Sequence, residues 1–396
     1  MKIGISCTGT NSSYKGGVNT YIFGLLDGFL NIGNEHKFQI YISNSDKNLY
    51  KKYLKNDNFE LIRVPDNNDL SLLLRILRRI TRKLSLVSLY KFISDLLSKR
   101  ITAIINKNSD ILYLPRTILY PYNLKIPTVV SIHDIQQFHY PQFFTKRQLK
   151  ARKISYGLTV KYANYIQASS NFIKSDLLKH YPSLKYSQIP VINEGVNIDK
   201  FKIKLDCKAI RDKYNINYKY LFFPAQLWPH KNHITILKTL KLIEEENGIK
   251  IPLLLTGAKM NNSKVVFEFI HDNKMNYVHY LGKVEFEDLV CLYQYAEFMI
   301  TAVLYESSSL PILESAASGT PIIASKTSPN EEMSKILRIN MFDPLDYEEL
   351  SKLILKLWEN DKIKEMQIKH NLKNIYKYSW NCVAKEYINL FTKIVS

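Results

Sequence analysis

The chain has 396 residues, more than one hydrophobic core usually holds, and its length predicts two domains of about 200 residues each. Hydrophobic residues make up 46% and charged residues 23% of it, which excludes wholesale disorder, a collagen and a coiled coil. No apolar run approaches the roughly 20 residues of a membrane span, and the first residues lack the features of a secretory signal. We therefore expect a cytoplasmic protein.

The net charge of +19 is unusual, and it comes from 55 Lys and Arg residues against 36 Asp and Glu residues. Such an excess implies an anionic partner: nucleic acid, an anionic membrane surface or phosphorylated ligands. A bias in overall composition is the alternative, because Lys, Ile, Asn and Tyr are all abundant and Lys is spread along the whole chain. Both explanations stay open at this point.

The N-terminal half alternates between predicted strands and helices. A short strand at 2–6 is followed by a loop at 8–17 and a helical pattern at 18–29. Helical patterns separate most of the strands that follow, which we predict at 38–42, 59–64, 110–114, 127–132 and 165–169. This alternation is typical of a parallel sheet with helices on both faces.

The same alternation restarts in the C-terminal half, after a seam near 193–202. The segment from about residue 351 to the end is helical. The fold class is therefore α/β, with two Rossmann-like domains that face each other across a cleft and bind ligands at the carboxyl ends of their strands. The strands of the second half are predicted at 219–224, 251–256, 277–281, 297–302 and 320–324.

Residues 71–100 differ from the rest of the chain. Five basic residues alternate there with Leu and Ile at helical spacing, and few acidic residues offset them. A basic amphipathic helix is typical of an element that binds an anionic membrane surface. The alternative is an ordinary surface helix whose apolar side joins the core. The basic residues are Arg75, Arg78, Arg79, Arg82 and Lys83.

Four cysteines lie far apart, without a C-x-x-C pair or a His-Cys cluster, so we expect neither a disulfide scaffold nor a structural zinc site. His230 and His233 have no Asp, Glu or Cys close in sequence, and no D-x-D triplet occurs. We therefore expect no metal ion and no cofactor. The cysteines are Cys7, Cys207, Cys291 and Cys382.

Three loops that follow predicted strands carry candidate ligand-binding residues. Gly16 and Gly17 precede a helix, where free backbone N–H groups suit a phosphate. His133 directly follows the strand 127–132 and can bind a hydroxyl or a phosphate, with Asp134 available to orient it. Lys231, at the turn of 222–233, can neutralise a diphosphate, and Asn232 can cap the next helix.

Residues 305–325 give the strongest local signal. Glu306 precedes a tight loop, and Glu314 lies about one turn into a helix that we predict from about Pro311 to Ser318. Carboxylates accept hydrogen bonds from neighbouring hydroxyl groups, so the two glutamates suit a sugar and a ribose. The start of the helix suits a phosphate.

In this order, these residues resemble glycosyltransferase family 4, the retaining enzymes of the GT-B fold that use nucleotide sugars, as in bacterial surface-polysaccharide mannosyltransferases. The resemblance covers nearly the whole chain. It rests in the N-terminal half on the GGV-x-x-Y loop at 16–21, on His133 and on the segment 193–201, where Glu194 departs from the family pattern. In the C-terminal half it rests on Lys231, Glu306, Leu310, Glu314, Phe342, Asp343, Pro344, Asp346, Ser379 and Trp380.

The resemblance implies an acceptor-side domain over 1–196, a nucleotide-sugar domain over 197–375 and a helix over 376–396 that crosses back to the first domain. It implies catalytic roles for His133 and Glu306, with Glu306 on the sugar hydroxyls. It also implies donor binding by Glu314 on the ribose, by the backbone N–H of Leu310 and by Gly16, Gly17, Gln226 and Lys231 near the diphosphate. Gln226 stands where many members carry Arg, and Ser307–Ser309 replace a glycine-rich loop.

The sequence thus predicts a metal-independent hexosyltransferase of surface polysaccharide biosynthesis, with GDP-mannose as the first donor to test. Its partners are a nucleotide sugar, a glycan or lipid-linked acceptor, and the inner face of the cytoplasmic membrane through 71–100. A catalytically silent GT-B scaffold protein is the main alternative. A GT-B epimerase or phosphorylase fits the two glutamates less well, and no nucleic-acid-binding motif accompanies the positive charge.

Overall fold

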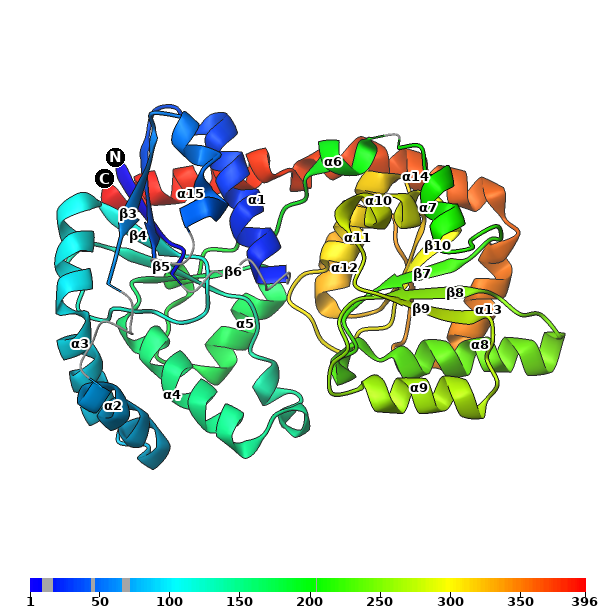
Figure 1. Cartoon of the computed structure of the whole chain (residues 1–396), viewed down its shortest axis with the longest axis horizontal. Coiled ribbons are helices and arrows are strands. Elements are labelled where there is room, and N and C mark those ends of the chain that lie inside the picture. Colours follow the sequence, from blue (N-terminus) through cyan, green and yellow to red (C-terminus); the bar gives the residue numbers. More distant parts are fainter. Residues whose placement is uncertain (9–16, 44–46, 66–71, 204) are drawn as a thin grey trace. The chain divides into compact units, whose positions relative to one another are not determined.

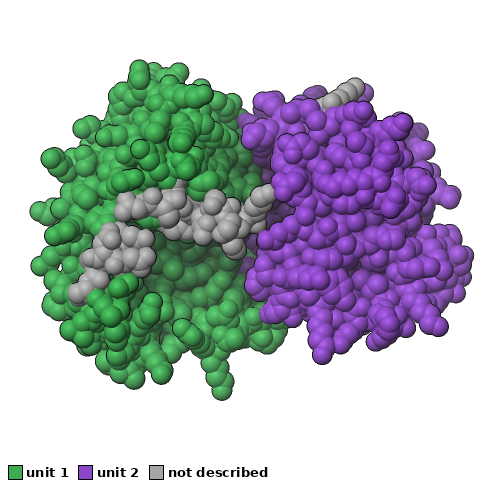
Figure 2. Space-filling model, viewed as in Figure 1, with its two compact units in different colours: residues 1–195, 380–396 green, residues 196–379 purple. Residues whose placement is uncertain are grey.

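The computed structural model describes residues 1–8, 17–43, 47–65, 72–203 and 205–396. The chain divides into two compact units (Figure 2). Unit 1 comprises Met1–Gly195 together with Trp380–Ser396, and unit 2 comprises Val196–Ser379. The first unit is therefore built from both ends of the chain, whereas the second is one continuous segment.

Unit 1 contains a parallel sheet of six strands in its described part, in the order β3-β2-β1-β4-β5-β6 (Figure 1). The strands are β1 (Lys2–Ser6), β2 (Lys37–Ile42), β3 (Phe59–Arg63), β4 (Ile111–Leu114), β5 (Thr128–Ile132) and β6 (Tyr165–Ala168). The helices are α1 (Gly17–Ile32), α2 (Leu72–Leu84), α3 (Val87–Asn108), α4 (Lys146–Tyr162), α5 (Asn171–His180) and α15 (Trp380–Val395). Buried apolar runs such as Thr128–Ile132 explain why the central strands need helices on both faces.

Unit 2 repeats this topology, because its strand order is β12-β11-β10-β7-β8-β9, again all parallel. The strands are β7 (Leu221–Pro224), β8 (Leu253–Thr256), β9 (Val278–Gly282), β10 (Phe298–Thr301), β11 (Ile322–Ser325) and β12 (Asn340–Phe342). The helices are α6 (Ile198–Lys202), α7 (Lys208–Lys213), α8 (His233–Asn247), α9 (Ser263–Asp272), α10 (Phe286–Gln294), α11 (Leu310–Ser318), α12 (Ser328–Ser334), α13 (Tyr347–Trp358) and α14 (Asp361–Asn374). In each unit the order reverses at the first strand, so ligands are expected beyond the carboxyl ends of the strands beside it.

Two expectations about secondary structure were wrong. The basic segment 71–100 is not one helix, because Ser85 adopts a left-handed conformation (φ 61°) and separates α2 from α3. The sixth strand of unit 2, β12, was not predicted, since its three residues are too few to show a periodic pattern. All predicted strands are present, with bounds within two residues of the observed ones.

The last helix completes the core of unit 1. α15 packs along α1, and Trp380 lies against Gly24 and Gly28, where an added Cβ would come within 2.1 Å and 2.4 Å of Trp380 atoms. Small residues at these two positions are therefore required for the close approach of the helices. Below them, the buried hydroxyl of Tyr21 is hydrogen-bonded to those of Tyr113 on β4 and Tyr387 on α15.

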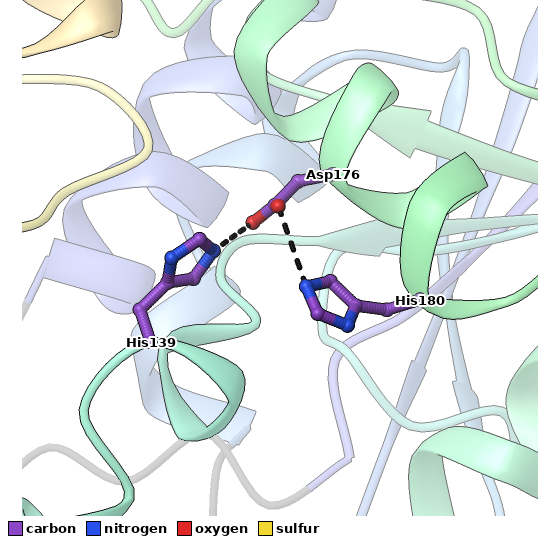
Figure 3. A group of neighbouring side chains, drawn as sticks. All are labelled: His139, Asp176 and His180. Carbon is purple, nitrogen blue, oxygen red and sulfur yellow. Dashed lines mark hydrogen bonds and ion pairs between the residues drawn. The ribbon is translucent and has the colours of Figure 1, made fainter.

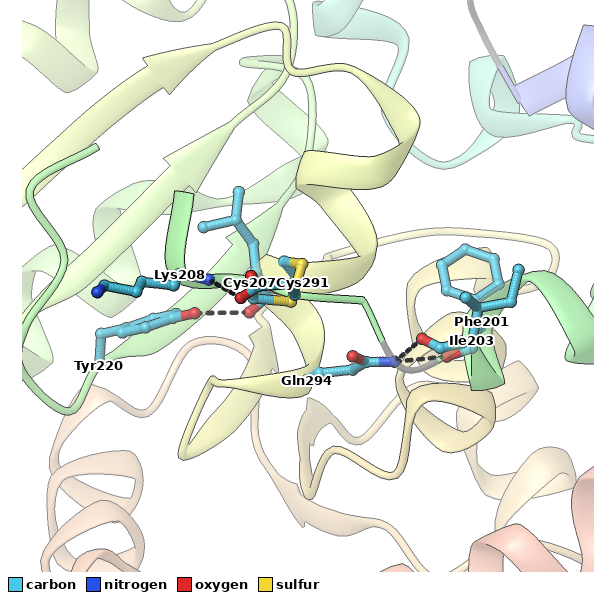
Figure 4. The surroundings of a disulfide bond; sticks show 9 residues. Phe201, Ile203, Cys207, Lys208, Tyr220, Cys291 and Gln294 are labelled. Atoms are coloured by element: carbon cyan, nitrogen blue, oxygen red, sulfur yellow. Dashed lines mark hydrogen bonds between the residues drawn. A yellow bond between two sulfur atoms is a disulfide. The ribbon is translucent and has the colours of Figure 1, made fainter. Parts of the chain in front are cut away.

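A disulfide joins Cys207 to Cys291 inside unit 2 (Figure 4). From the wide spacing of the cysteines we expected no disulfide scaffold. The structure contains one disulfide in unit 2, because folding brings together two cysteines that lie 84 residues apart. Both cysteines are buried, and α10 is also tied to the preceding chain by Gln294 Nε2, which donates to the carbonyls of Phe201 and Ile203 at 3.0 Å.

None of the helices in the described part of the chain combines the length and the apolar character needed to cross a bilayer.

Candidate active site

The turn after β7 holds Lys231 in a fixed position. A short 3-10 helix, Pro229–Lys231, ends at Asn232, which adopts a left-handed conformation (φ 56°). The Asn232 side chain donates to the carbonyls of Ala302 and Pro344 at 3.1 and 2.7 Å, and so anchors the turn beside the ends of β10 and β12. Asn232 is the N-cap residue of α8, as expected, but its side chain accepts no hydrogen bond from the helix backbone, and its Oδ1 instead accepts from the Thr235 hydroxyl at 3.1 Å.

Gln226 lies in the same turn, where its Oε1 accepts a hydrogen bond from Trp228 Nε1 at 2.8 Å. Gly257, directly after β8, approaches this turn so closely that a Cβ would lie 2.6 Å from the carbonyl oxygen of Ala225. Its φ of +126° also favours glycine. Our sequence reasoning missed Gly257, although a glycine directly after a buried strand is a signal of close backbone approach.

Lys231 and Glu306, 75 residues apart in sequence, meet in the folded unit. Lys231 Nζ lies 3.1 Å from Glu306 Oε2. Glu306 is 8% exposed, and its second oxygen, Oε1, is buried without a hydrogen-bond partner among the described residues. Ser309 Oγ, in the same loop, is also buried without a partner there. Buried polar atoms are nearly always paired, so these two oxygens indicate a missing hydrogen-bond donor.

Lys231 is the cation of this turn, because its two histidine neighbours are neutral. Burial and the charge of Lys231 lower the pKa of both His230 and His233 to about 3. His233 also packs its ring against Phe223, with centroids 4.5 Å apart. These histidines therefore add no charge for a ligand.

Glu314 lies one turn into α11, which begins at Leu310 with Pro311 in its first turn. Tyr293 donates a hydrogen bond to Glu314 Oε2 at 2.8 Å. Burial raises the pKa of Glu314 to about 7, although the Tyr293 hydrogen bond opposes the rise. The start of α11 presents the positive end of the helix dipole from the loop that carries Glu306. Leu310, Glu306 and Glu314 thus belong to one loop-and-helix element.

His133 and Gly17 belong to unit 1, whereas the other described candidates belong to unit 2. Gly17 is the exposed first residue of α1, and Gly16 lies outside the described residues. His133 directly follows β5, and its Nε2 lies 3.0 Å from the carbonyl oxygen of Pro115.

Glu194, not Asp134, is the carboxylate that faces His133. His133 Nδ1 lies 3.7 Å from Glu194 Oε1, whereas Asp134 pairs with Arg152 at 2.8 Å. Burial alone would lower the pKa of His133, but Glu194, the Pro115 carbonyl and the charge of Asp134 together raise it. The expectation that Asp134 orients His133 was therefore wrong, and the residue noted as a departure from the family pattern is the one in contact.

A pocket of about 580 Å³ lies beside His133 in unit 1. Its lining includes Ser6 and Leu114 at the ends of β1 and β4, and the side chains of Arg116 and Tyr156. It therefore lies where the strand order of this sheet reverses, the place at which α/β sheets bind ligands.

Comparison with known proteins agrees with this architecture. Residues 15–200 match the family model described as Glycosyltransferase Family 4, and residues 206–374 match the model described as Glycosyl transferases group 1. The two models together account for most of the chain. It belongs to the family 4 (group 1) glycosyltransferases.

Among relatives of this glycosyltransferase, O-antigen chain mannosyltransferase B of Escherichia coli is 24% identical over 80% of this chain and 82% of its own. O-antigen chain mannosyltransferase RfbU of Salmonella typhimurium is 27% identical over 50% of this chain and 51% of its own. Among solved structures, HepE of Anabaena in complex with UDP and glucose has a TM-score of 0.71 at 15% identity, over 99% of this chain and 100% of that one. The GT-B fold is thereby shown, and its family membership makes the chain a glycosyltransferase enzyme.

Proposed function

We propose that this glycosyltransferase moves a hexose from a nucleotide diphosphate sugar to a glycan or lipid-linked glycan, with retention of configuration and without a metal ion. The observation that carries the proposal is the Glu306 carboxylate, which is buried beside Lys231 with one oxygen unpartnered among the described residues. Leaving a buried carboxylate oxygen unpaired is costly, and a sugar hydroxyl is a donor of the required kind.

Each candidate residue then has one role. Glu306 accepts hydrogen bonds from the hydroxyls of the donor sugar, and Glu314 accepts them from the ribose. Lys231 and the start of α11 stabilise the negative charge that develops on the leaving diphosphate. The leaving phosphate itself takes the proton of the acceptor as it attacks from the same face, so the reaction needs no protein nucleophile.

The acceptor side is the pocket of unit 1. Arg116 gives this pocket a positive charge, and His133 adds a second when it is protonated, which its raised pKa favours. Phosphate groups of a lipid-linked acceptor are a matching ligand, and Ser6 and Thr8 add hydroxyls for a glycan.

GDP-mannose is the first donor to test, because two relatives are named as O-antigen mannosyltransferases. A uridine nucleotide is the alternative, and the HepE complex with UDP and glucose supports it. Base recognition therefore has to be measured with both nucleotides.

The test is transfer or hydrolysis across GDP-mannose, UDP-glucose, UDP-galactose and UDP-GlcNAc, with chelator present. We expect turnover of one donor, lost in Glu314→Ala and Lys231→Ala and kept in the control Lys238→Ala, an exposed lysine on α8. Donor binding without turnover, even with acceptor lipid extracts, would favour the silent scaffold. A strict requirement for a divalent metal would overturn metal independence, and an inverted product would overturn retention.

We also propose that α2 holds the enzyme at the inner face of the cytoplasmic membrane. The helix packs on α3 and buries only Thr81, while six of its seven apolar residues are 38–67% exposed and Leu74 is half-buried (Figure 1). On a helical projection these apolar residues form one stripe, and the four arginines lie on the other side. An exposed apolar stripe flanked by arginines matches anionic lipid. The six exposed apolar residues are Leu72, Leu73, Ile76, Leu77, Ile80 and Leu84.

Sedimentation with vesicles of phosphatidylglycerol and phosphatidylcholine tests this placement. Serine substitutions of Arg75, Arg78, Arg79 and Arg82 should weaken binding by roughly fivefold or more per charge, because each basic residue near anionic lipid contributes about 1 kcal/mol. The matched control replaces four exposed basic residues of α4, Lys146, Arg147, Lys150 and Lys153. Equal losses of vesicle binding in both variants would show that the net charge of the protein, and not α2, causes the binding. Dimers that form with increasing protein concentration in the absence of lipid would show that the apolar stripe binds a second copy of the chain.

A further inference from the structure

Three side chains with metal-binding atoms gather in unit 1, apart from the residues used above (Figure 3). Asp176 and His180 lie one turn apart on α5, and His139 follows the short 3-10 helix Gln136–Phe138 that comes after β5. One ligand atom from each residue lies within 4.8 Å of the other two.

Asp176 contacts both imidazoles, but only its contact with His139 is a hydrogen bond. His139 Nε2 lies 2.5 Å from Asp176 Oδ2, a direct hydrogen bond that ties the segment after β5 to α5. His180 Nε2 lies 3.6 Å from Asp176 Oδ1, which is too long for a hydrogen bond. The second imidazole is nevertheless aimed at the carboxylate (Figure 3).

Packing fixes the orientation of this second imidazole. Phe138 stacks on the His180 ring with centroids 4.2 Å apart and planes 12° apart. The Asp176 side chain is 6% exposed, while those of His139 and His180 are 28% and 21% exposed. The two imidazole rings are thus partly exposed, while the carboxylate between them is buried.

The spacing suits a small ion with short bonds. Zinc bonds to imidazole nitrogen and carboxylate oxygen are about 2.0–2.2 Å long, so tetrahedral ligand atoms lie roughly 3.4 Å apart. The two imidazole nitrogens lie 2.5 and 3.6 Å from the two different carboxylate oxygens of Asp176, and one ligand atom from each residue lies within 4.8 Å of the other two. Side-chain rotation is therefore needed to bring one oxygen and both nitrogens to the spacing of a bound ion. His180 is also the last residue of α5, where the negative end of the helix dipole favours a cation.

We propose that His139, Asp176 and His180 form a binding site for a divalent transition-metal ion, with zinc as the preferred ion. Two imidazoles and one carboxylate leave a fourth position for water, as in zinc sites with three protein ligands. The ion crosslinks α5 to the segment that begins at His133. This site goes beyond the proposed function, because the residues proposed for sugar transfer, in unit 2 and at the unit 1 pocket beside His133, do not include these three and are proposed to need no metal. Its ligands lie up to 41 residues apart in sequence, and so no local motif announces them.

Metal binding to the chelator-treated full chain tests the proposal directly. We expect about one Zn²⁺ per chain by calorimetry, and Co²⁺ should give the visible absorption of a tetrahedral ion. His180→Gln should weaken Zn²⁺ affinity by roughly tenfold or more and abolish the Co²⁺ absorption, and Asp176→Asn should do the same. The matched control is His271→Gln, because His271 is an exposed histidine beside the carboxylate of Asp272 with no third ligand among the described residues.

Unchanged Zn²⁺ affinity in His180→Gln, or an equal loss in His271→Gln, would overturn the site and assign the binding to the surface. Thermal unfolding gives a second readout, since an ion that binds only the folded chain raises Tm. Zn²⁺ should raise Tm of the wild type and leave that of His180→Gln unchanged. Neither readout depends on donor turnover, so failure of this proposal and failure of the proposed function are distinguishable.

Discussion

The two units share one strand order but place opposite chemistry at the ends of their strands. Unit 2 pairs the Glu306 carboxylate with Lys231, and burial raises the pKa of Glu314, a second carboxylate of the same loop-and-helix element, to about 7. Unit 1 presents His133 between Glu194 and the Pro115 carbonyl, and these acceptors raise its pKa. The same strand order thus supports a carboxylate that is more easily protonated in unit 2 and an imidazole that is more easily protonated in unit 1.

This contrast shows that the strand topology determines where a site lies, whereas the residues around each side chain determine its pKa and therefore its charge. Burial raises the pKa of Glu314 against the Tyr293 hydrogen bond, whereas Glu194, the Pro115 carbonyl and the charge of Asp134 raise that of His133 against burial. A rise in pH therefore has opposite consequences: it charges Glu314, whose pKa is about 7, and it removes the charge of His133 once the pH passes the raised pKa of that imidazole.

The largest expected effect is a loss of stability in unit 1 that leaves unit 2 unchanged. Trp380→Ala removes a 5% exposed side chain that fills the space above Gly24 and Gly195, and we expect it to cost about 3–5 kcal/mol of unfolding free energy. Denaturant titration, followed by fluorescence, measures this loss. Trp358→Ala, on α13 of unit 2, should leave the unit 1 transition in place, and an equal shift of that transition would show that the units do not unfold separately.

The next effect concerns turnover in unit 2. Glu306→Gln keeps the shape of the side chain but removes its charge, so we expect transfer to fall by about 100-fold. Initial rates with the preferred donor measure this fall. Glu268→Gln, an exposed pair partner of Lys264 on α9, is the control and should retain full activity. A decrease of less than about threefold would remove Glu306 from the catalytic roles.

Donor affinity should depend on pH through Glu314. Hydroxyl groups donate to the ionised carboxylate, which is scarce below the pKa of about 7, so donor binding should tighten about tenfold between pH 6 and pH 8. Calorimetry with the intact nucleotide sugar measures this change, because its diphosphate carries no terminal phosphate that titrates in this range. Glu314→Gln should bind more weakly at both pH values and with a flat profile. A profile as steep as that of the wild type would assign the titration elsewhere.

The smallest effect has the opposite sign and belongs to unit 1. Because the folded-state pKa of His133 is raised, its ion pair stabilises the fold below the unfolded-state pKa, and this contribution is lost as pH rises through the folded value. Glu194→Gln should therefore cost more stability at pH 5.5 than at pH 9, by on the order of 1 kcal/mol. Denaturant titrations at the two pH values measure the difference. The double variant Glu194→Gln/His133→Gln should show the same pH dependence of the unfolding free energy as Glu194→Gln alone.

Strands and the loops after them were predictable because buried parallel strands form short apolar runs that end at polar residues. Lys231, Glu306 and Glu314 were each found in this way, from their place after a strand. Their contacts were not predictable, since Lys231 and Glu306 are 75 residues apart and meet only in the folded unit.

Errors arose where adjacency in sequence was taken for adjacency in space. Asp134 follows His133 directly, yet its side chain pairs with Arg152 while Glu194 approaches the imidazole from 61 residues away. The break at Ser85 had no glycine or proline to signal it. The bridge between Cys207 and Cys291 likewise depends on how α7 and α10 pack, which no local pattern encodes.

The discontinuous makeup of unit 1 has a consequence for biosynthesis. A ribosome delivers the whole of unit 2 before it reaches Trp380, so the unit that starts later along the chain is complete first. Until the last 17 residues emerge, the face of α1 around Gly24, Gly28 and Phe29 has no helix to cover it. A nascent chain stalled short of residue 380 would carry an unfinished unit 1 and a finished unit 2, and only synthesis through the last helix completes both units.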